Sequence, residues 1–433
     1  MTEVGLSLFL IWCVSVTFVF YITRDMASPQ IMSMAILGLF FSDIFFSKYD
    51  YYVYSTYIVI MLTILLSTII PYFSIHRKCD SYANHNQSCN SKESIKSLQK
   101  LPTLLFWIVS LPAILAMYYL INKFGGFDGY LVAAQFRTRE FHGLGAIKSI
   151  ISTYYVVNIF YFSYIINKNY IGNKKEYFLF GAHVTIALSL AVVSFSRGTI
   201  FMGLVFMGLI WHYSRSRIKP TIVIFTLGVF LVIASLLGVV RETFNMNNGE
   251  IDFGLQDKEQ IYKPTWMIYG TFPLESILNS DHVDKKLGQT YLTAVTNFVP
   301  RVYWPEKPDP GGVVFTKEYT KNMYDEYSHF TTGIFPEAMI NFGVWFGVLF
   351  GAIQLFLLNY FLTYYYIRNK FHRNILVQTH RDILIVILYS YSIVSATMLL
   401  TGEFTSIIVS WIIKVITTLS IYFLIRTSHL KKR

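Results

Sequence analysis

The stretch YVYSTYIVIMLTILLSTIIPYFS, residues 52–74, contains no charged residue and shows no amphipathic period. A helix needs about 20 apolar residues to cross a hydrocarbon layer about 30 Å thick. We therefore interpret this stretch as a membrane-spanning helix. Similar runs recur along the chain, and we expect eleven spans, at residues 4–22, 30–46, 52–74, 101–122, 149–166, 177–195, 199–213, 220–240, 340–366, 382–400 and 405–426.

The composition excludes an ordinary soluble domain. Of the 433 residues, 54% are hydrophobic, 18% are aromatic and 14% are charged, whereas soluble domains contain about 25% charged residues. A soluble fold of this length could not bury so much apolar surface. The expected fold class is an all-α integral membrane protein, with residues 1–433 in a single polytopic membrane domain.

The N-terminal residues 1–21 are apolar, but Glu3 stands where a signal peptide carries basic residues, and no small-residue cleavage site follows. We expect this segment to be retained as the first span. The cysteines Cys13, Cys79 and Cys89 lack zinc-ligand spacing, and we expect no disulfide framework.

The distribution of basic residues predicts the orientation. If Lys431, Lys432 and Arg433 are cytoplasmic, the segments on that side hold 20 of the 36 lysines and arginines, and the short segments on the other side hold six. Because cytoplasmic loops carry the excess of basic residues, we expect the N-terminus outside and the C-terminus inside. The longest connection, residues 241–335, then lies on the outer face, and loops of such length are usually functional.

Motifs typical of soluble enzymes are absent from the sequence. There is no G-x-x-x-x-G-K-[ST], G-x-S-x-G or H-E-x-x-H, and no D-x-D pair for a metal site of a nucleotide-sugar enzyme. We expect no metal, no cofactor and no nucleotide-dependent chemistry. The formal net charge of +11 belongs to the segments between spans, so no nucleic-acid partner is expected.

Arginine recurs on the predicted outer side, against the usual charge bias. The residues are Arg137 and Arg139 in FRTRE, Arg197 in SFSRGT, Arg241 at a span end and Arg301 in PRVYWP. Guanidinium groups bind phosphate oxygens bidentately, so converging arginines at a membrane surface suit a lipid-linked diphosphate. The alternative for each arginine is contact with lipid headgroups or with a neighbouring glutamate.

Glu337 is the first candidate for proton transfer. It lies in TGIFPEAMINFG, residues 332–343, where the 241–335 loop re-enters the membrane, and Pro336 favours a first helical turn there. We expect its carboxylate to activate a hydroxyl group as a general base. A helix cap or dipole partner is the alternative, and His329 is then the next candidate base, with His142 as a further one.

Two polar residues lie inside predicted spans. We interpret His183 as a hydrogen-bonded core residue. Lys414, near the middle of the last span, is costly there unless it faces a polar cavity or pairs with an acid, for which Asp43 and Glu403 are candidates.

Together these motifs resemble the Wzy-type O-antigen and oligosaccharide repeat-unit polymerases of Gram-negative inner membranes. The resemblance rests on FSRGT at residues 195–199, which opens a span, and on Pro300-Arg301 with WPEKP at residues 304–308 in the long outer loop. It rests also on Glu337 followed by Asn341-Phe342-Gly343. It covers the architecture of most of the chain through short motifs.

The resemblance implies a GT-C type of glycosyltransferase architecture and undecaprenyl-diphosphate-linked glycans as donor and acceptor. The growing chain would move from its lipid carrier to the non-reducing end of an incoming repeat unit at the periplasmic face of the inner membrane. A polysaccharide chain-length regulator is a further partner that such an activity admits. Two alternatives remain open: an O-antigen ligase, which would depend on a histidine of the outer loop, and a lipid-linked oligosaccharide flippase.

Overall fold

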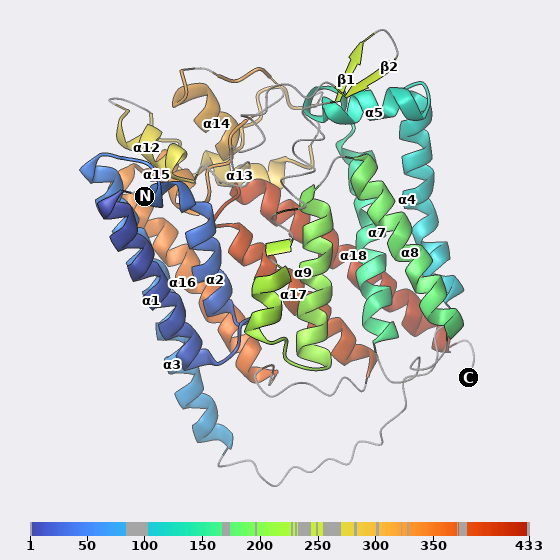
Figure 1. Ribbon diagram of the computed structural model, residues 1–433, viewed down its shortest axis with the longest axis horizontal. Coiled ribbons are helices and arrows are strands. Elements are labelled where there is room, and N and C mark those ends of the chain that lie inside the picture. Colours follow the sequence, from blue (N-terminus) through green and yellow to red (C-terminus); the bar gives the residue numbers. More distant parts are fainter. Residues whose placement is uncertain are drawn as a thin grey trace. The chain divides into compact units, whose positions relative to one another are not determined.

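The computed structural model describes residues 2–83, 103–166, 174–194, 197–226, 228–229, 232, 244–247, 250–253, 270–280, 284–299, 303–321, 323–326, 329–369, 371 and 379–430. These residues are mainly helical, with two short strands (Figure 1). The first helices are α1 (Glu3–Thr23), α2 (Pro29–Phe40), the 3₁₀ helix η1 (Ser42–Phe45), α3 (Tyr51–Ala83), α4 (Leu104–Lys123), α5 (Phe127–Gln135), α6 (Arg137–Glu140), α7 (Gly145–Ile165), α8 (Lys174–Val193) and α9 (Arg197–Ser214).

The strands β1 (Phe244–Asn247) and β2 (Glu250–Phe253) pair antiparallel, with Phe244 opposite Phe253. The remaining helices are α12 (Thr271–Leu278), α13 (Gln289–Thr296), α14 (Gly311–Glu318), α15 (Ile334–Phe342), α16 (Val344–Arg368), α17 (His380–Met398) and α18 (Phe404–Leu430). The segment 241–335, which the sequence presents as one long loop, therefore contains several short helices among its described residues.

Seven of the described helices are long and apolar enough to cross a membrane. They are α1, α4, α8, α16, α17, residues Tyr51–Ile75 of α3 and residues Phe404–Thr427 of α18. Each coincides with a predicted span, which confirms an all-α protein of membrane-spanning character. The shorter apolar helices α2 and α9 and the 21-residue α7 fall on three more predicted spans, and the predicted span 220–240 lies largely outside the described residues.

The chain divides into two compact units. Unit 1 comprises residues 1–92, 267–373 and 391–412, and unit 2 comprises residues 93–266, 374–390 and 413–433. Whether the two act as a single membrane domain stays a prediction.

Unit 2 contains α4, α7 and α8, which pack around a buried histidine. His183 has no exposed surface, and its Nε2 lies 2.9 Å from Ser110 Oγ while its Nδ1 lies 2.8 Å from Asn158 Nδ2. The ring stacks on Tyr154 at a centroid distance of 4.4 Å. A ring with partners at both nitrogens satisfies the requirement on a buried polar group, so the interpretation of His183 as a hydrogen-bonded core residue is confirmed.

In unit 1 the helices α2, α3 and α16 share a buried polar bridge. Ser33 Oγ donates to Asn359 Oδ1 at 3.4 Å, and Asn359 Nδ2 donates to Ser67 Oγ at 3.3 Å. Asn359 is 2% exposed. A buried amide that loses its partners is costly, so this bridge fixes how α16 is rotated about its own axis.

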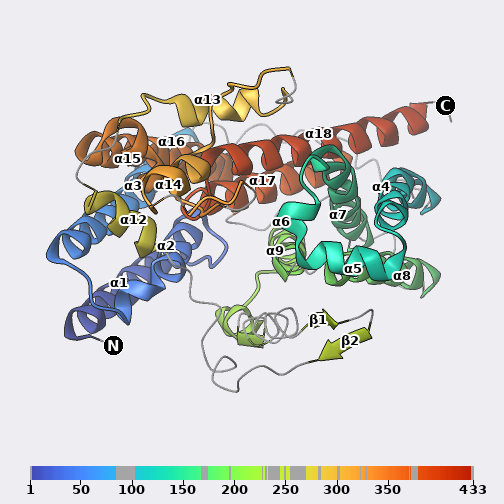
Figure 2. The same ribbon diagram turned by 90° about the horizontal axis from the view of Figure 1, so that it is seen from above.

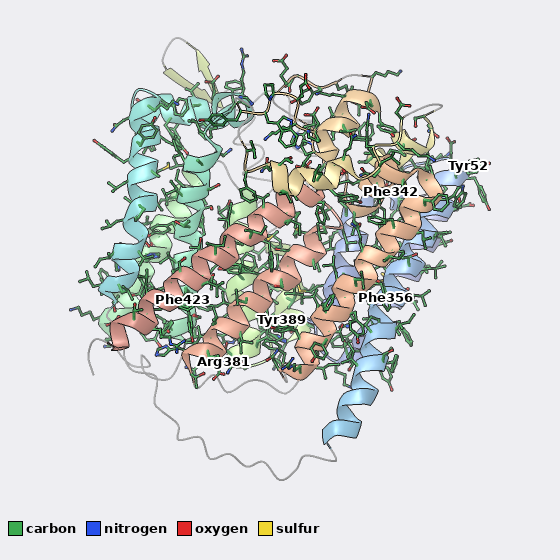
Figure 3. The ribbon with its side chains drawn as sticks, turned by 180° about the vertical axis from the view of Figure 1, so that it is seen from behind. Tyr52, Phe342, Phe356, Arg381, Tyr389 and Phe423 are labelled. Atoms are coloured by element: carbon green, nitrogen blue, oxygen red, sulfur yellow. The ribbon has the colours of Figure 1, made fainter. Side chains whose placement is uncertain are left out.

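The short helix α15 folds back along α16 as a tight helical hairpin. Gly343 joins them with φ of 81°, a conformation that favours glycine. A Cβ at Gly347 would lie 2.4 Å from Met339 Cα, and one at Gly351 would lie 2.9 Å from the Phe335 ring. The partners of later residues in α16 are thus earlier residues in α15, which makes the pair antiparallel. Figure 3 shows Phe342 at the end of α16 where the hairpin turns, and Phe356 further along.

This hairpin determines where Glu337 lies along the axis of α16. Between the two glycine contacts, Glu337 lies opposite residue 349 of α16, about 7 Å along the axis from the start of that helix. The carboxylate therefore lies below the end of the membrane-spanning α16 and not above it.

The charge count assigns residues 241–335 and the short connections 47–51 and 401–404 to the outer side. Residues of the long segment contact the ends of the neighbouring helices at this end of unit 1. Gly270 N donates to Phe40 O at 3.1 Å, Thr271 Oγ1 donates to Asp43 Oδ1 at 2.7 Å, and Ile334 N donates to Leu399 O at 2.8 Å. Figures 1 and 2 show α12, α14 and α15 gathered at that end of the unit 1 helices. The contacts place the three segments on the same side, as the charge count requires.

We predict that Gly347→Ala destabilises the protein by about 1–3 kcal/mol, because the added methyl group overlaps the backbone of α15. Gly181→Ala in α8 is the matched control, since a Cβ there meets nothing within 4 Å and alanine is the better helix former. Thermal unfolding of the purified proteins in detergent measures both. Equal melting temperatures for Gly347→Ala and the wild type would contradict the hairpin contact.

Candidate functional site

The carboxylate of Glu337 is the centre of a buried polar cluster in unit 1. Glu337 has no exposed surface. Its Oε1 accepts a hydrogen bond from Thr290 Oγ1 of α13 at 2.9 Å, and its Oε2 accepts one from the backbone N–H of Phe404, the first residue of α18, at 2.7 Å. Glu337 therefore caps a helix, but that helix is α18 and not its own helix α15. The first N–H groups of a helix have no partner inside it, so they accept such a cap from elsewhere.

Asn341 completes the connection between α15 and α13. It lies one turn after Glu337, so both side chains project from the same face. Asn341 Nδ2 donates to Thr290 Oγ1 at 2.7 Å and to Glu337 O at 2.8 Å, and Asn341 Oδ1 accepts from Gly288 N at 2.9 Å. The Thr290 hydroxyl therefore accepts from Asn341 and donates to Glu337, which fixes the direction of its hydrogen.

A second acid, Glu403, precedes Phe404 at the junction of α17 and α18. It is 5% exposed, and its Oε2 accepts from Gly312 N at 3.0 Å. The same oxygen lies 3.7 Å from His329 Nε2, and the imidazole is about one third exposed. The sequence suggested Glu403 only as a partner for Lys414; its position beside His329 brings it into the candidate site.

The glycine pair Gly311-Gly312 at the start of α14 packs between the two acids. A Cβ at Gly311 would lie 2.7 Å from Glu337 Cδ, and a Cβ at Gly312 would lie 2.5 Å from His329 Cδ2 and 2.9 Å from Glu403 Oε2. No larger residue fits at either position without displacing a carboxylate or the imidazole. This pair was not among the predicted site residues, although two glycines directly after Pro310 indicate a close approach of the backbone.

Burial dominates the electrostatics of Glu337. Loss of solvent raises the pKa of Glu337 to about 7, against the opposing hydrogen bonds from the Phe404 N–H and the Thr290 hydroxyl, while the nearby Glu403 raises it further. A place in the first turn of a helix favours the carboxylate anion, and burial outweighs that effect. For His329, the hydrogen bond to Glu403 raises the pKa, and partial burial opposes the rise.

Two carboxyl groups and an imidazole at one end of unit 1 form an arrangement suited to proton transfer near neutral pH.

Comparison with protein-family models, with curated proteins and with solved structures gives no match for this chain. Its chemistry is therefore inferred from its own residues.

The arginines are not brought together among the described side chains. Arg139 lies in α6 of unit 2 and is exposed. Arg137 and Arg197 belong to α6 and α9, but their side chains lie outside the described residues, as do Arg241 and Arg301 altogether. Their convergence on a diphosphate stays a prediction.

Lys414, in α18, has its ammonium group 5.8 Å from the centre of the Phe206 ring within unit 2. Asp43, one of the two acids proposed as its partner, accepts hydrogen bonds from Thr271 and Tyr49 in unit 1. Glu403, the other, accepts one from Gly312. Each acid thus has a defined place without Lys414.

We predict that the stability of the protein falls as pH rises from about 5 to 8. A native pKa of about 7 for Glu337, above the usual value of about 4.3, means that the folded state binds more protons in this range, and ionisation then costs up to about 3 kcal/mol. Glu337→Gln carries no such charge, so its stability relative to the wild type should improve steadily across the same range.

The measurement is thermal unfolding in detergent from pH 5 to 8.5, with Glu306→Gln, which removes an exposed carboxylate, as the control. A difference between Glu337→Gln and the wild type that does not change with pH would contradict the raised pKa.

Proposed function

We propose that this protein is a polymerase of undecaprenyl-diphosphate-linked oligosaccharide repeat units, for an O-antigen or a related surface polysaccharide. A sugar hydroxyl at the non-reducing end of the incoming unit attacks the anomeric carbon of the growing glycan. The bond from that carbon to the diphosphate breaks, and undecaprenyl diphosphate leaves. The resemblance in the segments around Arg301 and Glu337 supports this reaction.

The observation that carries the proposal is the state of Glu337. A general base works best when its pKa lies near the working pH, and burial raises the pKa of Glu337 to about 7. The ionised form is then accessible near neutral pH and can take the proton of the attacking hydroxyl. The diphosphate is already a good leaving group, so removal of this proton is the main remaining chemical need.

Access to Glu337 passes through Thr290. Since the carboxylate has no exposed surface and the Thr290 hydroxyl covers Oε1, a proton reaches Glu337 through that hydroxyl. Apo sites commonly hold such groups away from their reacting geometry.

His329 has a complementary role in this proposal. It is partly exposed, and Glu403 raises its pKa and so favours the imidazolium form. A cation at that position suits a diphosphate oxygen better than it suits proton removal. Glu337 and His329 are thus the two catalytic candidates, with opposite charges.

The donor diphosphate is proposed to bind Arg197, Arg241 and Arg301, with Arg137 and Arg139 as further contacts. Their type supports this, because guanidinium groups match the geometry of phosphate oxygens. Their predicted position on one face of the membrane supports it as well.

The proposed setting is the bacterial inner membrane, with eleven spans in a GT-C-like arrangement and the site facing the periplasm. The seven candidate spans and the excess of basic residues on the opposite side support it. The contacts of residues 270–271 and 334 with the ends of α2 and α17 support it too, because they place segments assigned to the outer side together.

An O-antigen ligase is the second candidate. One observation favours it: His329, a histidine of the long outer segment, lies beside Glu403 in the same cluster as Glu337. A flippase receives no comparable support from the candidate site, since Glu337, Glu403 and His329 gather at one end of unit 1.

We predict that a strain lacking this protein makes lipid A core capped by a single repeat unit and no long polymer. Gel analysis of the surface glycan, with complementation by the wild-type chain, measures this. Loss of all capping would indicate the ligase, and accumulation of lipid-linked units in the cytoplasmic leaflet would indicate a flippase.

We predict that Glu337→Gln lowers the polymerisation rate by at least about 100-fold, because the amide retains the shape but loses the basicity. In the wild type the rate should fall about tenfold for each pH unit well below 7, as Glu337 becomes protonated. Purified protein with lipid-linked repeat units measures both, and Glu306→Gln is the control. A near-normal rate for Glu337→Gln would leave the carboxylate a structural cap and direct the search to His329.

A further inference from the structure

The helix α13 presents its polar and apolar residues in the reverse of the usual order. Its buried residues include Thr290, Thr293 and Thr296, which lie at 0%, 3% and 6% exposure. Leu292 and Val295 on the other side are 51% and 71% exposed. A helix at a water-facing surface buries its apolar stripe and exposes its polar one, so α13 is built for surroundings less polar than the protein beneath it.

Exposed apolar residues continue beyond the helix, on either side of the exposed Asn297. The sequence of α13 is QTYLTAVT, without a charged residue. Phe298, which follows it, is 56% exposed, and Val299 is 36% exposed. We call Leu292, Val295, Phe298 and Val299 the outer face of α13. A contiguous exposed patch of this kind marks a contact with a membrane or another protein.

The Tyr291 side chain of α13 packs against the flank of α16, and its ring also lies near Phe342 and Phe404. The Tyr291 ring lies 5.7 Å from the Phe350 ring, and its hydroxyl donates to Gln354 Oε1 at 3.5 Å. Gln354 is ten residues after the start of α16, about 15 Å along the helix axis. The side chain of Tyr291 therefore reaches well down the flank of a membrane-spanning helix.

The neighbouring surface of α16 identifies the occupant. Phe346, Leu349 and Ile353 lie within one turn of Phe350 on α16, and they are 71%, 57% and 49% exposed. In a candidate membrane span, such residues contact lipid. The outer face of α13 extends this lipid-facing strip and ends at Val299, whose carbonyl oxygen accepts from Lys307 Nζ at 2.9 Å. Figure 2 shows α13 at the edge of unit 1, away from α1 and α2.

We infer that α13 is immersed in the membrane, with its outer face against the acyl chains of bilayer phospholipids in the leaflet at the α15 end of unit 1. Thr290 then covers Glu337 from that side, and α13 separates the hydrocarbon from the carboxylate. This inference depends on α16 as a membrane span and not on the reaction proposed above.

Spin labelling in liposomes of phosphatidylethanolamine and phosphatidylglycerol tests the inference. The labels are introduced by Leu292→Cys or Val295→Cys in a chain whose three cysteines are changed to serine. Collision with oxygen, which concentrates in hydrocarbon, is compared with collision with a water-soluble nickel chelate. Ile353→Cys on α16 is the lipid-facing control, and Glu306→Cys is the water-facing control.

We expect the ratio of oxygen to nickel collisions at both positions to match that at Ile353→Cys and to exceed that at Glu306→Cys several-fold. Nickel access equal to that of Glu306→Cys would overturn the inference. Protection from both reagents with spin–spin broadening would overturn it too, because a second copy of the chain would then cover the face. Phe298→Cys supplies another position if either variant fails to fold, and the readout needs no enzymatic activity.

Discussion

The hydrogen bonds of one buried carboxylate hold together the parts of the candidate site. Through Glu337, the helix α15 is joined to Thr290 of α13 and to the first N–H of α18. These segments are far apart in the sequence, and the carboxylate supplies an acceptor to each. A buried donor left without an acceptor costs about 1–3 kcal/mol, so the ends of α13 and α18 are positioned by the same group that is proposed to carry the chemistry.

Two opposing effects set the charge of that group, and the larger is desolvation. The N-terminus of α18 and the Thr290 hydroxyl stabilise the anion, while burial and the neighbouring Glu403 destabilise it. The glycine pair is what permits this balance, because any side chain at Gly311 would occupy the space of the carboxylate. Glu337 is thus enclosed, and its pKa stays near neutral pH.

The sequence predicts most of the spanning helices because an apolar run of about 20 residues has few alternatives in a bilayer. Glu337 was also identifiable, from the proline before it and its place at the edge of a span. Glu403, Gly311 and Gly312 were not, because their roles come from contacts with distant residues: Gly312 meets Glu403 across 91 residues of chain, and Gly311 meets Glu337. The burial of the threonines of α13 was hidden for a related reason: Thr290 is received by Glu337 and Asn341, and Thr293 by Thr405, all from distant parts of the chain.

The turn at Gly343 has a mechanical consequence. The helices α15 and α16 are joined by this residue alone, and they pack closely through Gly347 and Gly351. They therefore move as one rigid body, which includes Glu337 on the shorter helix. A spanning helix adapts to a thicker or thinner bilayer by changing its tilt. A change in the tilt of α16 would therefore move the carboxylate and its contact with Thr290 of α13, so the geometry of the acid cluster would depend on the thickness of the surrounding lipid.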